Sequence, residues 1–96
     1  MRQRYLVTYD VCDPKRLRHV FETLKGFGLH LQLSVFLCDL TRQGLAELKA
    51  ALTEHINARH DQVLLVDLGP MGGRADAAIE SLGRAYERLE HGAVVV

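Results

Sequence analysis

Residues 5–19 read YLVTYDVCDPKRLRH, and this stretch sets the beginning of the fold. Its first five residues are nearly all apolar and rich in aromatic and β-branched side chains, which predicts a central strand. Asp10 ends that strand, and Asp13 is placed to cap a helix that has Pro14 at its first position, where the missing N–H costs nothing. The stretch therefore predicts a strand that leads into a helix, with an acidic residue at the strand tip close to a basic helix start.

The helix after Pro14 is predicted to bury one apolar stripe and to expose a basic face. The stripe consists of residues that recur at helical spacing, namely Leu17, Val20, Phe21 and Leu24. The side chains that fall away from it include Lys15, Arg16, Arg18 and His19. Gly26 and Gly28 supply the helix stop.

The middle of the chain predicts further strands and a second helix. Residues 31–40 alternate only partly between apolar and polar side chains, which indicates one long strand or two strands joined at a kink. Thr41 caps a helix whose buried stripe is Leu45, Leu48, Leu52 and Ile56. Residues 63–68 form another apolar strand, closed by Gly69-Pro70. A ferredoxin-like βαββαβ fold of the α+β class therefore requires residues 31–40 to supply two strands.

The C-terminal part of the chain departs from this pattern. We expect one domain overall, with a core over residues 1–70 and a C-terminal segment over residues 71–96. Apolar residues at helical spacing, with charged residues around them, predict a helix between about residues 75 and 90. A chain of 96 residues buries a modest core, so a partner subunit is a reasonable expectation.

Composition excludes several classes of function. The 12 basic and 12 acidic residues cancel, so any nucleic-acid binding must come from a local cluster, and residues 15–19 are the obvious one. Cys12 and Cys38 lack the count and spacing of a disulfide framework or a zinc site, and no signal-peptide pattern precedes the first strand, so a reducing cytoplasm is expected. No run approaches the roughly 18 consecutive apolar residues that cross a bilayer, so we expect no membrane role.

Asp10 is the residue whose position points most directly to chemistry. Carboxylate oxygens are hard ligands suited to Mg²⁺, which takes one or two carboxylates and leaves its other positions to water and substrate phosphate. Nearby Lys and Arg side chains would hold the rest of a polyanion. A strand-end aspartate is also an ordinary turn former, and Arg16 and Arg18 can equally be a solvated helix face.

An ordered set of motifs resembles the Cas-two family of CRISPR-associated proteins over roughly residues 5–68. The set comprises Tyr9-Asp10-x-x-Asp13-x-Lys15-Arg16, a helix ending near Gly26-Phe27-Gly28, Gln32-x-Ser34-Val35-Phe36, and Leu40-Thr41. The resemblance implies a ferredoxin-like fold with an antiparallel sheet and a C-terminal segment exchanged in a homodimer. The exchanged strand would lie near residues 77–81 or at residues 93–96, in place of the helix that the local pattern predicts.

The resemblance also implies a function and a set of site residues. It implies an Mg²⁺-dependent endonuclease acting on single-stranded RNA or on DNA, in which Asp10 is catalytic and the Asp10 residues of two subunits share the metal. The implied nucleic-acid-binding residues are Tyr9, Lys15, Arg16 and Arg18, supported by Ser34 and Phe36. The chain departs from the family where Leu17 interrupts the basic run, where His19 replaces a common Arg or Lys, and where His30-Leu31 precedes Gln32 without the usual Arg.

Two other functions remain open. The resemblance equally implies a non-catalytic dimer that bridges CRISPR-associated integrase of the Cas-one type and duplex DNA during spacer acquisition, a role that does not need Asp10. A ferredoxin-like module that binds a small ligand is a third possibility, because a fold does not determine a function.

Overall fold

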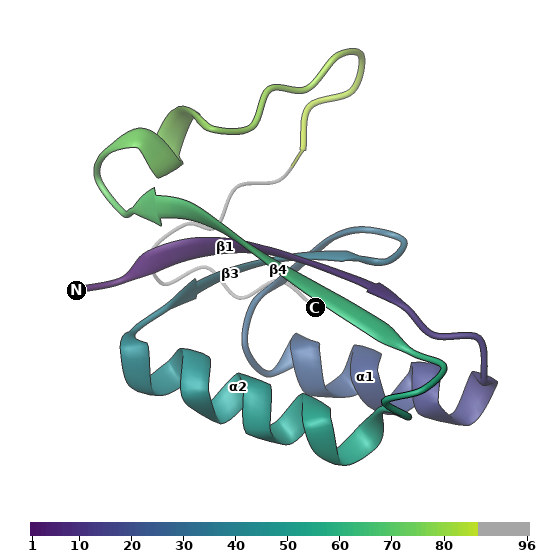
Figure 1. Ribbon diagram of the computed structural model, residues 1–96. Coiled ribbons are helices and arrows are strands. Elements are labelled where there is room, and N and C mark those ends of the chain that lie inside the picture. Colours follow the sequence, from purple (N-terminus) through teal and green to yellow (C-terminus); the bar gives the residue numbers. More distant parts are fainter. Residues whose placement is uncertain (87–96) are drawn as a thin grey trace.

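The structure is a computed structural model that describes residues 1–86. Six elements make up the core in the order β1 (Gln3–Asp10), α1 (Pro14–Lys25), β2 (Leu29–Gln32), β3 (Val35–Leu40), α2 (Arg42–His55) and β4 (Gln62–Pro70), as Figure 1 shows. A short 3₁₀ helix, η1 (Arg74–Ala77), follows. Neither α-helix in the described part is long and apolar enough to cross a membrane.

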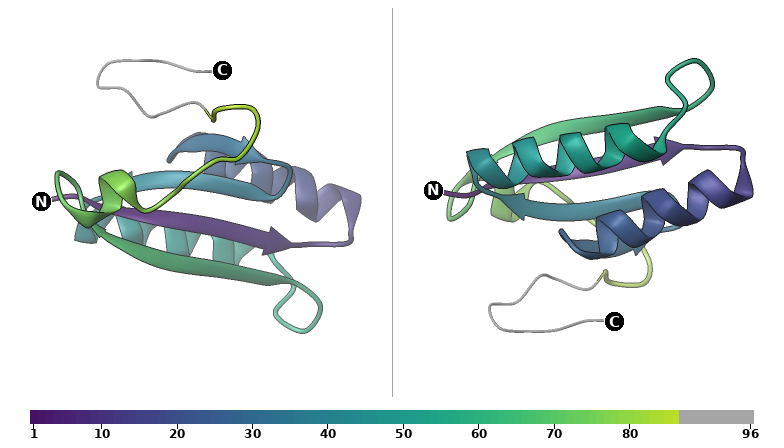
Figure 2. Two further views of the ribbon diagram at one scale, coloured as in Figure 1. Left: turned by 90° about the horizontal axis from the view of Figure 1, so that it is seen from above. Right: turned by 90° about the horizontal axis from the view of Figure 1, so that it is seen from below.

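The four strands form one antiparallel sheet in the order β2-β3-β1-β4. Both α-helices cover the same face of this sheet (Figure 2). This arrangement is the ferredoxin-like βαββαβ fold of the α+β class, as predicted. The segment predicted as one or two strands is two, β2 and β3, separated by Leu33 and Ser34.

Alternation along the strands builds the core between the sheet and the helices. Val7 and Tyr9 of β1 and Phe36 and Cys38 of β3 belong to the buried cluster on the helical face. The helices contribute their own buried residues, Val20 and Leu24 from α1 and Leu48 and Leu52 from α2. One predicted stripe position is wrong: Leu17 is 36% exposed, because it lies near the start of α1 beyond the edge of the buried cluster.

Both helix starts carry the predicted side-chain caps. The Asp13 carboxylate accepts a hydrogen bond from the Arg16 N–H at 2.9 Å. The Thr41 hydroxyl accepts one from the Gly44 N–H at 3.0 Å. Each cap satisfies a backbone donor that has no partner inside the first turn of its helix.

The sheet face away from the helices carries a polar pair and exposed apolar residues. Arg4 of β1 and Asp39 of β3 face each other, with the Arg4 Nε 2.7 Å from the Asp39 Oδ1. Hydrogen bonding to Asp39 raises the pKa of the Arg4 guanidinium. On β4, Leu64 is 50% exposed and Val66 is 44% exposed. We call this surface the open face.

The segment after β4 returns across the open face without forming a long element (Figure 2). The helix predicted over residues 75–90 is wrong for its described part, since only η1 is helical and residues 78–86 are irregular. Residues 77–81 also form no strand within one chain; that strand was expected against a second copy and stays a prediction. The alternative strand at residues 93–96 lies outside the described residues.

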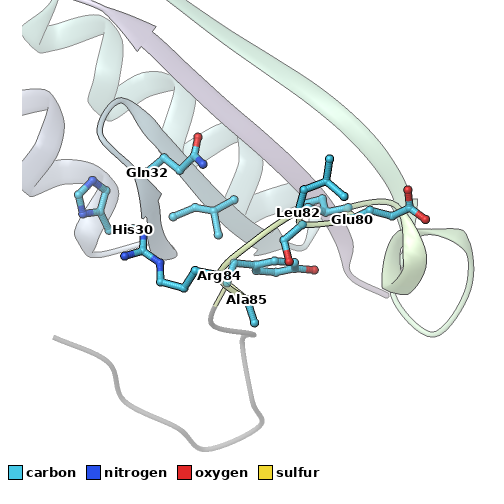
Figure 3. A pocket seen from close by; sticks show the side chains of 10 residues that line it. His30, Gln32, Glu80, Leu82, Arg84 and Ala85 are labelled. Atoms are coloured by element: carbon cyan, nitrogen blue, oxygen red, sulfur yellow. The ribbon is translucent and has the colours of Figure 1, made fainter.

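A hollow of about 520 Å³ separates β2 from this returning segment. His30 and Gln32 of β2 lie on one side, and Glu80, Leu82 and Arg84 lie on the other (Figure 3). The backbone of the segment is attached to the core at its beginning, where the Met71 N–H donates to the Arg2 carbonyl at 3.0 Å. Ala75 of η1 is 2% exposed, so η1 also packs closely on the core.

Candidate nucleic-acid interface

Asp10 occupies the C-terminal tip of β1, where the strand ladder ends opposite Gln62 of β4. Its side chain is exposed. Within residues 1–86, no side chain or backbone group forms a hydrogen bond or ion pair with the Asp10 carboxylate. By contrast, the neighbouring Asp13 carboxylate is already used as the helix cap. Asp10 is therefore the acidic group at this tip that is available to an external ligand.

One chain alone supplies little of a metal site. No group of three or more His, Cys, Asp or Glu side chains that could hold a metal ion occurs in the described residues. Mg²⁺ usually takes only one or two protein carboxylates and fills its shell with water and phosphate oxygens. Asp10 therefore fits as one protein ligand of Mg²⁺. A second carboxylate or a substrate phosphate would have to supply the further ligands.

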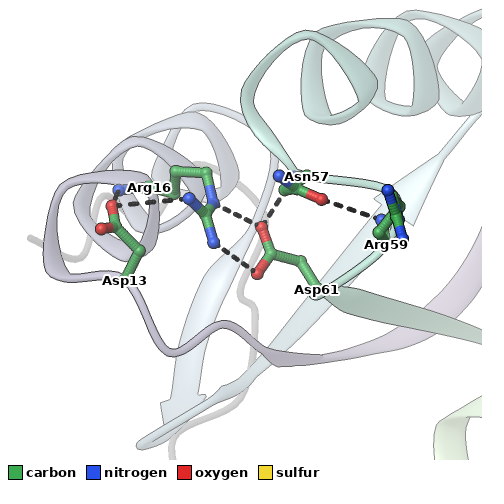
Figure 4. A network of polar contacts seen from close by, with 5 residues as sticks. All are labelled: Asp13, Arg16, Asn57, Arg59 and Asp61. Atoms are coloured by element: carbon green, nitrogen blue, oxygen red, sulfur yellow. Dashed lines mark hydrogen bonds and ion pairs between the residues drawn. The ribbon is translucent and has the colours of Figure 1, made fainter.

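Arg16 is held by an acidic partner that sequence reasoning missed. Its Nε lies 2.8 Å from Asp61 Oδ2 and its Nη2 lies 3.2 Å from Asp61 Oδ1 (Figure 4). Asp61 also accepts a hydrogen bond from the Asn57 N–H at 2.7 Å, and its side chain has no exposed area. The expectation that Arg16 simply faces solvent is therefore wrong, because two of its guanidinium nitrogens are occupied inside the protein.

This ion pair shifts the pKa of both partners. Hydrogen bonding to Asp61 raises the pKa of Arg16. Hydrogen bonds from Arg16 and from the Asn57 backbone hold the pKa of Asp61 below its usual value. Asp61 could have been predicted from the antiparallel pairing of β1 and β4. That pairing places Gln62 opposite Asp10, so the preceding residue, Asp61, lies close to the tip of β1.

Lys15 and Arg18 differ from Arg16 in their exposure and in their ion pairs. Both side chains are exposed, and neither has an ion-pair partner in the part of the chain that the structure describes. They stand on the first turns of α1, where backbone N–H groups also favour an anion. Lys15 and Arg18 are therefore exposed basic groups that are available to contact phosphate, whereas two guanidinium nitrogens of Arg16 are held by Asp61.

Tyr9, Ser34 and Phe36 lie beneath this surface. Tyr9 is 6% exposed, and its ring centroid lies 6.2 Å from that of the fully buried Phe36. Burial raises the pKa of the Tyr9 hydroxyl. The Ser34 carbonyl accepts a hydrogen bond from the Tyr9 N–H at 3.1 Å, which ties the β2–β3 turn to β1. Tyr9 and Phe36 thus support the strand tip from the core.

A pocket of about 470 Å³ adjoins Asp10, and its walls come from three parts of the fold. The end of β1, one side of α1 and the β2–β3 turn enclose it. Its lining is mainly apolar, with two charged residues, and consists of Tyr9, Asp10, Val11, Pro14, Leu17, Arg18, Phe21, His30, Leu33 and Ser34. Sequence reasoning did not assign Phe21 or Leu33 to a site, because only tertiary packing brings the turn beside the helix.

Comparison with known proteins connects this geometry to a family. The family model described as CRISPR associated protein Cas2 matches residues 1–72, which include all four strands and both α-helices of the described part of the chain. The chain belongs to the Cas2 family. This result confirms the resemblance inferred from the ordered motifs.

Curated members of the Cas2 family align along nearly the whole chain. A Rhodospirillum rubrum protein named CRISPR-associated endoribonuclease Cas2 1 is 46% identical over 96% of this chain and 89% of its own length. A Geobacter sulfurreducens protein named CRISPR-associated endoribonuclease Cas2 is 38% identical over 100% of both chains.

Solved structures agree with this Cas2 assignment. The crystal structure of Streptococcus pyogenes Cas2 superposes with a TM-score of 0.70 at 34% identity, covering 83% of this chain and 99% of the other. A hypothetical protein from Thermus thermophilus superposes with a TM-score of 0.75 at 28% identity, covering 91% of this chain and 100% of the other. The Cas2 fold therefore extends through the strands and helices that position Asp10.

Proposed function

We propose that this Cas2-family chain is a CRISPR-associated endonuclease that hydrolyses phosphodiester bonds in single-stranded RNA or in DNA. The observation that carries the proposal is the Asp10 carboxylate, which is exposed at the tip of β1 and has no hydrogen-bond or ion-pair partner among residues 1–86. Lys15 and Arg18 stand nearby, exposed and without an ion-pair partner in the described part of the chain. The names of the aligned relatives, which are endoribonucleases, support the reaction class.

Each residue has a part in this chemistry. Asp10 would hold Mg²⁺, which when bound supplies stabilisation of the charge that develops on the phosphate and activation of water. Lys15 and Arg18 would neutralise flanking phosphates and hold the strand against the tip of β1. Arg16 acts through Asp61, because their ion pair fixes the first turn of α1 relative to the start of β4.

The active form in this proposal is a homodimer. Among residues 1–86, Asp10 is the carboxylate at the tip of β1 that has no partner, so a second copy would bring the second Asp10. Two carboxylates in proximity repel each other, and a divalent cation between them removes that repulsion. The exposed Leu64 and Val66 of the open face are apolar surface that a second copy would cover.

Cleavage by purified wild type and the Asp10→Asn variant tests the proposal directly. Labelled single-stranded RNA and double-stranded DNA are incubated across a Mg²⁺ titration, with chelator controls. We expect metal-dependent cutting by wild type and a loss of about a hundredfold or more in Asp10→Asn, since the residue proposed to hold the metal is gone.

Glu54→Gln is the matched control, because it removes the same charge from the exposed surface of α2. Its cleavage rate should equal that of wild type. Equal cutting by wild type and a folded Asp10→Asn dimer would contradict the proposal.

A second function follows if the exposed cations, and not Asp10, are the groups that matter. Lys15 and Arg18 are exposed cations, whereas the carboxylate at the strand tip is single in each chain. We propose as the alternative a non-catalytic dimer that holds duplex DNA beside the Cas-one type integrase during spacer acquisition in antiviral defence. In that role Arg18→Gln with Lys15→Gln would reduce integration severalfold, while Asp10→Asn would leave it unchanged.

A further inference from the structure

We propose that the pocket beside Asp10 binds one unstacked nucleobase of a single-stranded RNA. The base-binding role rests on the function proposed above and narrows its substrate from nucleic acid in general to single strands. The pocket measures about 470 Å³, within the range of about 300–1,000 Å³ that is usual for small-ligand sites. A base in a duplex could not enter it without leaving its stack.

The composition of the walls suits an aromatic ring. Phe21 and His30 meet edge to face, with their ring centroids 5.0 Å apart, and His30 is exposed. Leu17 and Leu33 supply apolar surface from α1 and from the β2–β3 turn. Single-stranded nucleic acids are held in just this way elsewhere, by apolar and aromatic surfaces that accept any base face.

Leu33 is the residue that most strongly supports a base-binding role for this pocket. Leu33 is 88% exposed, in a two-residue interval where the chain turns between β2 and β3. Turns usually carry polar residues, whereas this one places an apolar side chain in the wall of the same pocket as the partly exposed Leu17. An occupant seated between Leu33 and Leu17 would cover apolar surface of both.

The charges around the pocket select a nucleotide over an apolar peptide. Arg18 lines the pocket and is exposed, so it can contact the phosphate attached to a bound base. Asp10 lines the same pocket, so the strand held by that base would pass the residue proposed to be catalytic. The apolar walls that would contact the base and the Arg18 side chain that would contact its phosphate thus belong to one pocket, as the binding of a single nucleotide requires.

Binding in the absence of divalent metal tests the pocket separately from cleavage. The probes are a fluorescein-labelled octamer of uridine ribonucleotides and an octamer of abasic tetrahydrofuran nucleotides with the same number of phosphates. Fluorescence anisotropy at about 50 mM salt with chelator reports both affinities. We expect wild type to bind the uridine octamer about tenfold more tightly than the abasic octamer, because stacking adds to phosphate contact.

Three variants identify the source of that preference. Leu33→Ser should remove most of the tenfold difference, while leaving the affinity for the abasic octamer unchanged. Arg18→Gln should weaken both octamers by a similar factor. Leu82→Ser is the matched control, because Leu82 is 98% exposed and does not line this pocket. It should behave as wild type with both octamers.

The outcomes separate the base pocket from the proposed nuclease. Equal binding of both octamers by wild type overturns the base pocket, and Asp10-dependent cleavage would then still support the nuclease. A Leu33→Ser variant that loses dimer mass in sedimentation but keeps the preference assigns the pocket to a protein contact and also overturns it. Absence of binding together with absence of cleavage overturns both.

Discussion

Gly28 stands where the chain leaves α1 and crosses against β3. A Cβ built on this residue would lie 2.6 Å from the Cys38 Sγ and closer still to the Leu37 carbonyl oxygen. Cys38 is fully buried, and burial raises the pKa of its thiol to about 12, so it serves here as a small packing residue. The backbone of the α1–β2 connection can therefore approach β3 only because residue 28 has no side chain.

Gly28→Ala should destabilise the protein by about 1–3 kcal/mol, since overpacking displaces a strand backbone that cannot move freely. Gly26→Ala is the matched control, because its Cβ would meet the Thr23 carbonyl at 3.4 Å, an ordinary contact. Urea denaturation of both variants measures the free energies of unfolding. If Gly28→Ala unfolded at the same urea concentration as Gly26→Ala, the close approach to β3 would not limit this position.

At the scale of elements, α1 is anchored at its start by two aspartates with different partners. Asp13 caps the backbone, and Asp61 binds the Arg16 side chain from the loop before β4. The cap fixes where the helix begins, whereas the ion pair fixes how the helix sits against the sheet. Together they hold the residues around Asp10 in one geometry.

Asp61→Asn should lower stability near neutral pH and lose that effect in acid. The pKa of Asp61 is lowered in the folded state from its ordinary value of 3.8. The contribution of the Asp61 carboxylate to the free energy of unfolding is therefore complete when the pH is above that ordinary pKa. It disappears as the pH falls through the lower pKa of the folded state. The difference in melting temperature between wild type and Asp61→Asn, measured from pH 7 to pH 2, should shrink below about pH 4.

The comparison with Asp61→Asn isolates one carboxylate, because the remaining acidic groups are common to both proteins. Asparagine also keeps an oxygen that can accept the Asn57 N–H. A difference in melting temperature that stayed constant across this pH range would show that the ion pair does not stabilise the fold. Arg16→Gln should reproduce the behaviour of Asp61→Asn if the pair acts as a unit.

For the whole molecule, the helices close one face of the sheet while the other face is covered only in part. Arg4 and Asp39 are nearly buried on the open face, whereas Leu64 and Val66 on β4 are not. The returning segment leaves a hollow beside β2 rather than packing along the sheet. An exchange of that segment between two copies would remove this hollow and cover more of the sheet.

Val66→Lys should therefore weaken the proposed homodimer about tenfold or more, because a charge would be buried at the contact. Wild type is expected to sediment as a dimer, and the variant is expected to shift toward monomer at the same concentration. Ala46→Lys on the exposed side of α2 is the control and should remain dimeric. A Val66→Lys protein that sedimented as wild type would place the dimer contact elsewhere.

Local patterns predicted some parts of this protein correctly and failed in others for identifiable reasons. The caps at Asp13 and Thr41 depend on neighbours within three residues, so they could be read directly. The tail pattern at residues 75–90 predicted a helix, yet its described part forms only η1 and irregular chain. Helical spacing alone cannot decide such a segment, because most helix stability comes from a surface on which the apolar face can pack.

The amino-acid sequence by itself determined the two α-helices with their caps, the first and last strands of the sheet and the position of Asp10 at a strand end. Each of these follows from periodicity and from hydrogen bonds between close neighbours. Only the tertiary structure decided that Arg16 is bound by Asp61, 45 residues away, and that Leu33 and Leu17 line one pocket. Those contacts arise from sheet order and helix placement, so no local pattern contains them.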